Sequence, residues 1–208
     1  LDDGTSYWPL GLDLCGYTYR SDDIQAHMAS LFHELADNGG NWARVWSADN
    51  VDDQTRYLLA VETGPYSGRY NMTNANNLDA VFESATALGI KVQLTINDQH
   101  SLRASKRWPL NFANAAKGGP ISNPAEWFTN EKAQRMFFRR LRYLISRYSH
   151  HTSLMAFETF NELDFVDGYN SSVAARWHER VIAYLRVTDP YKHLITSSWA
   201  LTKRDIIV

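Results

Sequence analysis

Side chains that can do chemistry gather where the chain leaves apolar, strand-like segments. One such segment ends at Phe160, and Asn161 and Glu162 follow it directly. The ends of the other segments also carry polar and aromatic residues: Asp13, Tyr17, Arg44, Trp46, Asp49, Asn97, Asp98, His100, Ser197, Ser198 and Trp199. Carboxylates can transfer protons, polar groups suit hydroxyls, and flat indole rings suit the apolar faces of pyranoses. These residue types therefore point to acid–base chemistry on a carbohydrate, provided that the fold brings them together.

The elements that must position these residues alternate between apolar strands and amphipathic helices. We expect strands at residues 9–15, 42–46, 90–96, 154–160 and 193–197, with helices between them that show apolar residues at helical spacing. Ser21-Asp22 can cap the first helix, and Gly39-Gly40 ends it. The second helix has its apolar residues between positions 78 and 88 and ends at Gly89. The third helix runs from about Glu131 to Tyr148, and the fourth lies between Ser171-Ser172 and Asp189-Pro190.

Strands that alternate with helices form a parallel sheet, because parallel neighbours need a long crossover. An open doubly wound sheet and a closed barrel both fit this order. The barrel is favoured because no Gly-x-Gly-x-x-Gly loop follows the first strand and because several strands carry polar residues that suit a lumen. The sequence thus predicts an α/β fold in one domain over residues 1–208, a partial (β/α)₈ barrel of about four and a half units.

The connecting segments differ in length at the two ends of the strands. Those that lead from a helix to a strand are short, whereas residues 47–73 and 97–130 form long connections from a strand to a helix. Long loops without secondary structure are usually functional, and barrel enzymes build their sites at the carboxyl ends of the strands. We therefore expect the working face at that end.

Composition excludes several classes of function. The net charge of −2 argues against nucleic acid or an acidic membrane as the main partner, and no apolar run reaches the roughly 18 residues of a membrane helix. Cys15 is the only cysteine, and the seven histidines show no spacing that would build a metal site on one helix. We expect no cofactor and no metal, and we interpret His150-His151 as a solvated pair.

The first residues suggest that the chain is cut from something longer. Asp3-Gly4 is a good hairpin turn, yet almost no strand precedes it, and the chain does not begin with methionine. Five strands account for only about half of a barrel.

Three segments carry a family resemblance. Residues 157–162, Phe-Glu-Thr-Phe-Asn-Glu, resemble the fourth-strand signature of clan A glycoside hydrolases, which include family 5 cellulases and mannanases. Residues 40–46 resemble the second strand of these enzymes and residues 89–92 the entry to their third. The opening at 3–11 is similar to members in which a β-sandwich module precedes the barrel. The resemblance covers nearly the whole chain, but Asn97 stands where many family 5 members have His, which leaves the subfamily open.

The resemblance implies a retaining hydrolase of β-linked poly- or oligosaccharides, secreted or periplasmic, and assigns roles to individual residues. Glu162 would be the general acid/base, Asn161 would hold the substrate 2-hydroxyl, and Arg44 would support the catalytic carboxylates. The side chains expected to contact substrate are Trp46, Asn97, Asp98, His100, Trp199 and Tyr17. The acid needs a raised pKa, which a position at the rim of a lumen lined by Phe160 and tryptophans would favour.

A retaining mechanism also needs a nucleophile about 5–5.5 Å from the acid. Glu158 lies four residues from Glu162, about 13 Å along a strand, and cannot serve; we expect it to be structural, paired with Arg44. The resemblance places the nucleophile at the end of a seventh strand, beyond Val208. Asp98 as the second carboxylate of an inverting pair is the alternative.

Two other functions remain open. A half barrel could bind carbohydrate without cleaving it, and its unpaired edges predict self-association, as a two-fold homodimer or with the missing half of the same barrel. An aldolase or phosphate-binding barrel is disfavoured because no lysine lies at the five strand ends. Trp108 and Trp127, in the long third loop, could be sugar platforms or anchors of the loop.

Overall fold

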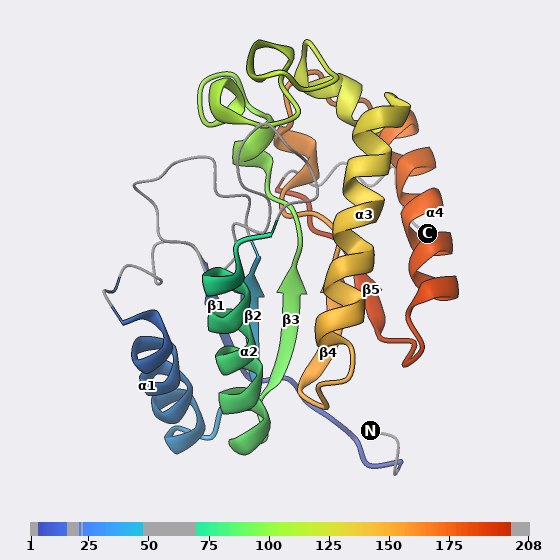
Figure 1. The fold of residues 1–208 in the computed structure, drawn as a ribbon. Helices are drawn as coiled ribbons and strands as arrows, with labels where there is room; N and C mark the ends of the chain where they lie inside the picture. Colours follow the sequence, from blue (N-terminus) through green and yellow to red (C-terminus); the bar gives the residue numbers. More distant parts are fainter. Residues whose placement is uncertain (1–3, 16–20, 22, 48–69, 201–208) are drawn as a thin grey trace.

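The computed structural model describes residues 4–15, 21, 23–47 and 70–200, and Figure 1 shows their arrangement. Strands and helices alternate along the chain in the order β1 (Gly11–Leu14), α1 (Ile24–Asp37), β2 (Trp42–Trp46), α2 (Met72–Ala87), β3 (Lys91–Thr95), α3 (Glu131–Tyr148), β4 (Leu154–Glu158), α4 (Ser171–Thr188) and β5 (Leu194–Thr196). The strands are all parallel, and their order in the sheet is the order in the chain. This is the predicted partial barrel, with β1 and β5 at the two edges of the sheet.

The helices begin where short polar side chains can satisfy free backbone N–H groups. Asn130 Oδ1 accepts from the backbone N–H groups of Lys132 and Ala133, and Asn71 and Asn170 cap α2 and α4 in the same way. The prediction for the first helix was wrong by one or two residues, because Asp23, and not Ser21-Asp22, accepts the N–H of Ala26. Gly39 and Gly89 follow the ends of α1 and α2 with φ of 79° and 69°, as helix-ending glycines do.

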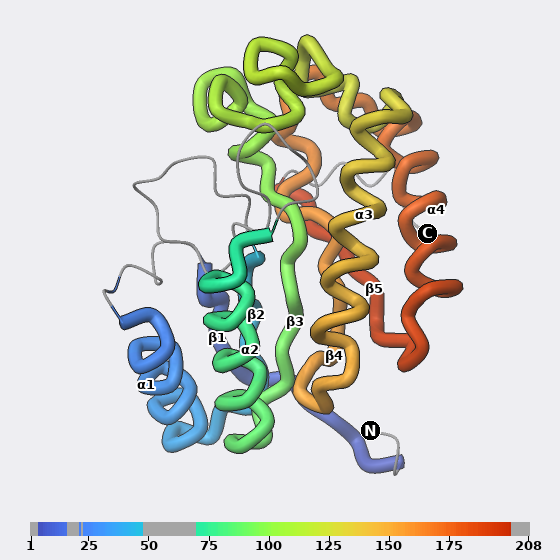
Figure 2. The backbone as a smooth tube through the Cα atoms, viewed as in Figure 1, coloured from blue at the N-terminus to red at the C-terminus, as the bar shows by residue number. Residues whose placement is uncertain are grey.

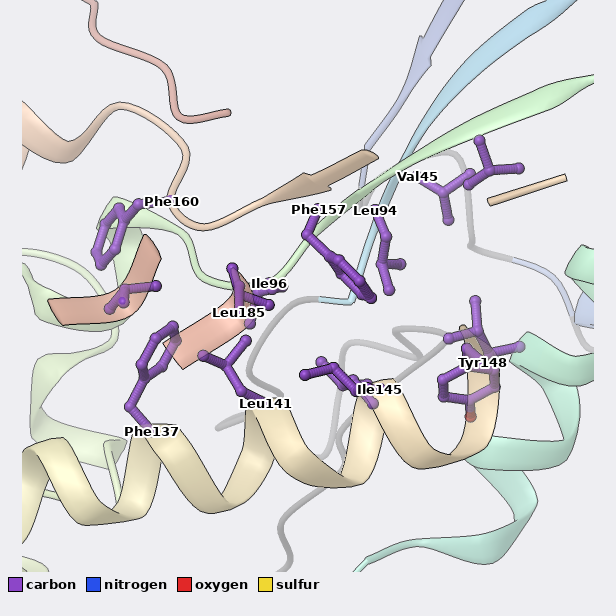
Figure 3. Close-up of a cluster of buried hydrophobic side chains, with 14 of the residues drawn as sticks. Val45, Leu94, Ile96, Phe137, Leu141, Ile145, Tyr148, Phe157, Phe160 and Leu185 are labelled. Carbon is purple, nitrogen blue, oxygen red and sulfur yellow. The ribbon is translucent and has the colours of Figure 1, made fainter. Parts of the chain in front are cut away.

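The core lies between the sheet and the helices. Val45, Leu94 and Phe157 point from the strands toward α3, whose apolar side meets them, as Figure 3 shows. That side of α3 consists of residues at helical spacing that are at most 4% exposed: Phe137, Leu141, Leu144, Ile145 and Tyr148. Burial of one such side chain stabilises a fold by about 1.5–3 kcal/mol. This layer fixes the helix-facing side of each strand and leaves the other side for polar residues.

A β-bulge in β4 decides which of its residues face away from the helices. Leu154 pairs with Val92 and Ala156 pairs with Gln93, so that Met155 has no partner on β3. Without the bulge, in a regular strand of the same length, Leu154 and Glu158 would share a face, since side chains alternate along a strand. With it, Leu154 joins the core, whereas Glu158 reaches the polar face opposite Thr95. The bulge therefore positions a carboxylate in the lumen.

The long connection after β3 is more ordered than the sequence predicted. It contains four short 3₁₀ helices, η2 (Gln99–Leu102), η3 (Trp108–Leu110), η4 (Ala115–Lys117) and η5 (Pro124–Phe128). In Figure 2 it folds above the carboxyl end of β3. Trp108 and Trp127 are 7% and 2% exposed, so they anchor this segment and do not offer a sugar platform. No helix in the described part of the chain is long and apolar enough to cross a membrane.

Candidate active site

An ion pair between β2 and β4, which reaches across β3, forms the centre of the polar face. Arg44 of β2 donates from Nε to Glu158 Oε2 at 2.6 Å and from Nη2 to Glu158 Oε1 at 2.5 Å. Its Nη1 donates to Asp13 Oδ2 of β1 at 2.8 Å. The Glu158 side chain is 1% exposed and that of Asp13 is 45% exposed. One guanidinium thus joins a buried carboxylate to a carboxylate that solvent can reach.

Glu158 is held in its ionised form. Burial by itself raises the pKa of this carboxyl, but the hydrogen bonds and the charge of Arg44, with hydrogen bonds from Thr95 and Gln93, outweigh burial and hold the pKa below its ordinary value. Thr95 Oγ1 donates at 2.7 Å and Gln93 Nε2 at 2.9 Å, both to Oε2. The prediction that Glu158 is a structural carboxylate paired with Arg44 agrees with this geometry. It cannot exchange protons with a substrate.

Asn161 continues the network toward the end of β4. Its Oδ1 accepts from Arg44 Nη2 at 2.6 Å and from Ser198 Oγ at 3.2 Å, and its Nδ2 donates to Gln99 Oε1 at 2.8 Å. The residue is 4% exposed. Three partners therefore fix the plane and the direction of this amide.

Glu162 follows in an uncommon backbone conformation. Its φ of 48° and ψ of 51° lie in the left-handed region, where a residue with a side chain is strained. The backbone N–H of Glu162 donates to Ser198 Oγ at 3.1 Å, and its side-chain Oε2 accepts from Gln99 Nε2. The side chain is only partly buried. Strain of this kind is typical of residues that a site holds in place for function.

The indole ring of Trp46 lies beside Arg44. Trp46 Nε1 donates to Asp13 Oδ1 at 3.0 Å, and the Arg44 guanidinium lies 5.1 Å from the centre of the Trp46 ring. Trp46 is partly exposed, so its ring remains accessible to a ligand. The structure thus brings Trp46, Arg44, Asn161 and Glu162 together on the polar face of the sheet, toward the carboxyl end of β4.

Two of the side chains expected to contact substrate are buried. Asn97 and Asp98 are each 1% exposed. Asn97 Oδ1 accepts from Arg140 of α3 at 2.7 Å, and Asp98 Oδ1 caps η2 by accepting from the N–H groups of His100 and Ser101 at 2.7 and 3.3 Å. Both side chains hold the loop on the barrel. A capping, buried Asp98 also does not fit the role of general base in an inverting pair.

The remaining candidates differ in their surroundings. His100 is 36% exposed at its side chain, with Nδ1 3.4 Å from Asp98 Oδ1, so it remains a candidate substrate contact. Trp199 is partly buried and its ring centre lies 5.7 Å from that of His178. Tyr17, like Asp49, lies outside the described residues. Phe160 does not line the lumen, because it is fully buried and packs against Phe128 and Trp177.

Sequence reasoning missed Gln99, which bridges Asn161 and Glu162. A glutamine has no characteristic spacing, and the only signal was its position two residues after Asn97 at the end of a predicted strand. Within the described residues no group of three or more His, Cys, Asp or Glu side chains could hold a metal ion. The chemistry that this arrangement offers is proton transfer at Glu162.

Comparison with known proteins gives one family. The model of the family "Cellulase (glycosyl hydrolase family 5)" matches residues 11–205. The chain is 28% identical to mannan endo-1,4-beta-mannosidase A of Podospora anserina over 199 residues, which cover 92% of this chain and 47% of that protein. It is 26% identical to the enzyme of the same name from Emericella nidulans over 198 residues, or 91% of this chain and 46% of that protein. The chain thus spans about half the length of the curated relatives it matches.

Solved structures show the same fold. The endo-1,4-beta-mannanase of Rhizomucor miehei superposes with a TM-score of 0.70 at 16% identity, over 93% of this chain and 56% of that one. The endo-beta-1,4-mannanase of Thermotoga petrophila gives a TM-score of 0.66 at 16% identity, over 95% of this chain and 43% of that one.

Proposed function

Since this chain belongs to the cellulase family, glycosyl hydrolase family 5, we propose that it carries the acid/base half of a retaining glycoside hydrolase that cleaves β-linked poly- or oligosaccharides. The observation that carries this proposal is Glu162, partly exposed at the carboxyl end of β4 and held by Gln99 and Ser198. In the first step its carboxyl protonates the glycosidic oxygen as the bond breaks, and in the second the carboxylate removes a proton from the attacking water. The nucleophile of this mechanism lies outside the described residues.

The neighbours of Glu162 divide the remaining tasks. Arg44 neutralises Glu158 and directs Nη2 at Asn161, so Glu158 is not the acid and that role falls to Glu162. Asn161 Nδ2 donates one hydrogen to Gln99, and its second hydrogen is available for the substrate 2-hydroxyl. Trp46 offers a flat face to a pyranose, and its Nε1 is held by the carboxylate of Asp13.

A β-1,4-mannan is the substrate that we propose first. The relatives that match the chain are named mannan endo-1,4-beta-mannosidases, and these names say what those proteins act on. The site itself supports a β-linked hexose polymer in general, through an indole, a carboxylate and an acid in one polar row. The substrate proposal is therefore carried by the relatives and the reaction proposal by the site.

The edges of the sheet suggest what the chain pairs with. β1 and β5 have no further neighbours among the described strands, and Leu12 and Leu194 on them are 54% and 60% exposed. Exposed apolar edges pair readily with other strands. We propose that further strands close the barrel, and that the 208-residue chain by itself pairs with a second copy; sedimentation of the chain as a monodisperse monomer would refute that pairing.

The reaction is tested by Glu162→Gln in the complete protein, with β-1,4-mannan and cellulose as substrates and release of reducing ends as the readout. We expect a loss of about 10²–10⁴-fold, because glutamine cannot donate the proton. Glu179→Gln, an exposed position on α4, is the matched control and should retain activity. Full activity of Glu162→Gln would refute the proposal, and binding without hydrolysis by the unaltered protein would favour a carbohydrate-binding barrel.

A further inference from the structure

We propose that Gln99 is a positioning residue for the acid: it occupies Oε2 of Glu162 with an N–H donor, so that the proton given to the leaving group is carried on Oε1. The inference rests on the proposed function of Glu162 and goes beyond it, by assigning the two oxygens of that carboxyl different roles. Gln99 is the first residue of η2 and is 3% exposed. The cap that Asp98 provides to η2 fixes the backbone from which the Gln99 side chain extends.

Arg44 determines which atom is the donor and which the acceptor in each hydrogen bond of this network. A guanidinium can only donate, so Arg44 must face the carbonyl oxygen Oδ1 of Asn161, at 2.6 Å. The other end of this amide, Nδ2, then faces Gln99 and can only donate to Oε1, at 2.8 Å. The remaining end of Gln99 is Nε2, which meets Glu162 Oε2. Arg44 on β2 therefore determines, through two amides, that Glu162 receives a donor.

Ser198 belongs to the same network and contacts both Glu162 and Asn161. Its Oγ accepts from the backbone N–H of Glu162 at 3.1 Å and donates to Asn161 Oδ1 at 3.2 Å. Backbone and carboxyl of Glu162 are thus both tied to Asn161, one through Ser198 and one through Gln99. Neither amide can rotate by 180° without bringing two donors or two acceptors together, which is costly in a buried site.

The chemical consequence concerns the form of Glu162 that exists after proton transfer. A donor on Oε2 favours the carboxylate over the acid, and the carboxylate is what remains when the glycosidic oxygen has taken the proton. The hydrogen bond therefore strengthens as the leaving group is protonated, and its contribution is largest for leaving groups that need a proton. It also leaves Oε1 as the oxygen from which the proton departs.

Two substitutions of Gln99 in the complete protein test this role. Gln99→Met keeps the length of the side chain and removes the donor. Gln99→Glu keeps the acceptor for Asn161 but places a second carboxyl oxygen against Glu162. The readouts are kcat/KM for phenyl and 2,4-dinitrophenyl β-mannobioside, one with a leaving group that needs protonation and one with a leaving group that does not, each measured across the pH range.

For Gln99→Met we expect about a tenfold loss with the phenyl substrate and less than about threefold with the dinitrophenyl substrate. The basic limb of the pH profile should move to higher pH by about one unit. The reason is that the carboxylate form of Glu162 loses the N–H donor that stabilises it relative to the acid form. Gln99→Glu should move the limb further in the same direction, because two carboxyls in contact share a proton. This second variant keeps the contact with Asn161 and so tests the inference even if the first folds poorly.

The control is Gln134→Met on α3, which also removes a buried glutamine amide, here one that donates to the Phe128 carbonyl at 2.8 Å. It should lower stability without moving the basic limb. Equal losses of activity on both substrates, or an unmoved basic limb in both Gln99 variants, would overturn the inference while the role of Glu162 stands. Full activity of Glu162→Gln on the phenyl substrate would overturn both.

Discussion

Replacing Glu162 by alanine and by glycine should change stability in the order opposite to the usual one. Both substitutions remove the carboxyl and its contact with Gln99, so those losses cancel when the two variants are compared. What remains is the backbone, which has φ of 48° and ψ of 51° at this residue. Alanine is strained in this conformation and glycine is not.

The size of the difference can be worked out from two opposing contributions. The left-handed conformation costs a residue with a β-carbon about 1–2 kcal/mol. Alanine recovers about 0.4–1 kcal/mol because its unfolded chain has less conformational entropy to lose than glycine has. The glycine variant should therefore have the higher free energy of unfolding, by about 1 kcal/mol.

Glu179, an exposed residue inside α4, provides the reference for the usual order. In a helix, alanine is more favourable than glycine by about 1 kcal/mol, so the two sites should differ in sign. Urea unfolding followed by tryptophan fluorescence measures all four variants. If alanine proved the more stable residue at both sites, the backbone at Glu162 would not be strained.

Four other substitutions test the polar face and the core. Arg44→Met leaves Glu158 buried without its charge partner and should lower the free energy of unfolding by about 3–5 kcal/mol at pH 7. Because burial then raises the pKa of Glu158, this deficit, measured by urea unfolding, should shrink as the pH falls toward 5. A deficit that does not depend on pH would contradict this. Burial lowers the pKa of His178 to about 4 from 6.5, so below pH 6.5 the unfolded chain binds a proton that the folded chain does not, and on the order of 3 kcal/mol of stability should be lost by pH 4. His178→Gln should lack that loss in parallel pH titrations of stability. Trp127→Ala should lower the free energy of unfolding by about 3–5 kcal/mol, as a core substitution does, whereas Trp46→Ala should lower it by less and raise KM; the reverse pattern would mean that Trp127 lies in the site.

The parts of the fold that repeat regularly were predictable. The apolar spacing of residues 131–148 matches α3 to the residue, and the polar residue Arg44 between the buried Ala43 and Val45 indicated which side of β2 faces the lumen. The pairing of Arg44 with Glu158 followed from one cation and one carboxylate expected within the same barrel lumen.

The parts that depend on strand ends were not predictable. Beyond Thr95 the backbone leaves the alternating pattern, so sequence parity could not reveal that Asn97 turns toward Arg140 or that Asp98 caps η2. Phe160, two residues after the end of β4, turns toward Phe128 and Trp177 for the same reason. Gln99 became visible only when its two partners were placed in space.

The unpaired Met155 allows the β4 segment to change its length by one residue. A strand repeats every two residues, so one surplus residue shifts the pattern by half a period. Deleting Met155 would make the Val92–Leu154 and Gln93–Ala156 pairs consecutive, which restores the uninterrupted period and keeps Phe157 toward the helices and Glu158 toward the polar interior. Deletion of Met155 should therefore keep the facing of Glu158, and an alignment with a relative that lacks this extra residue needs a one-residue gap here, or it places the acid one residue away from its true position.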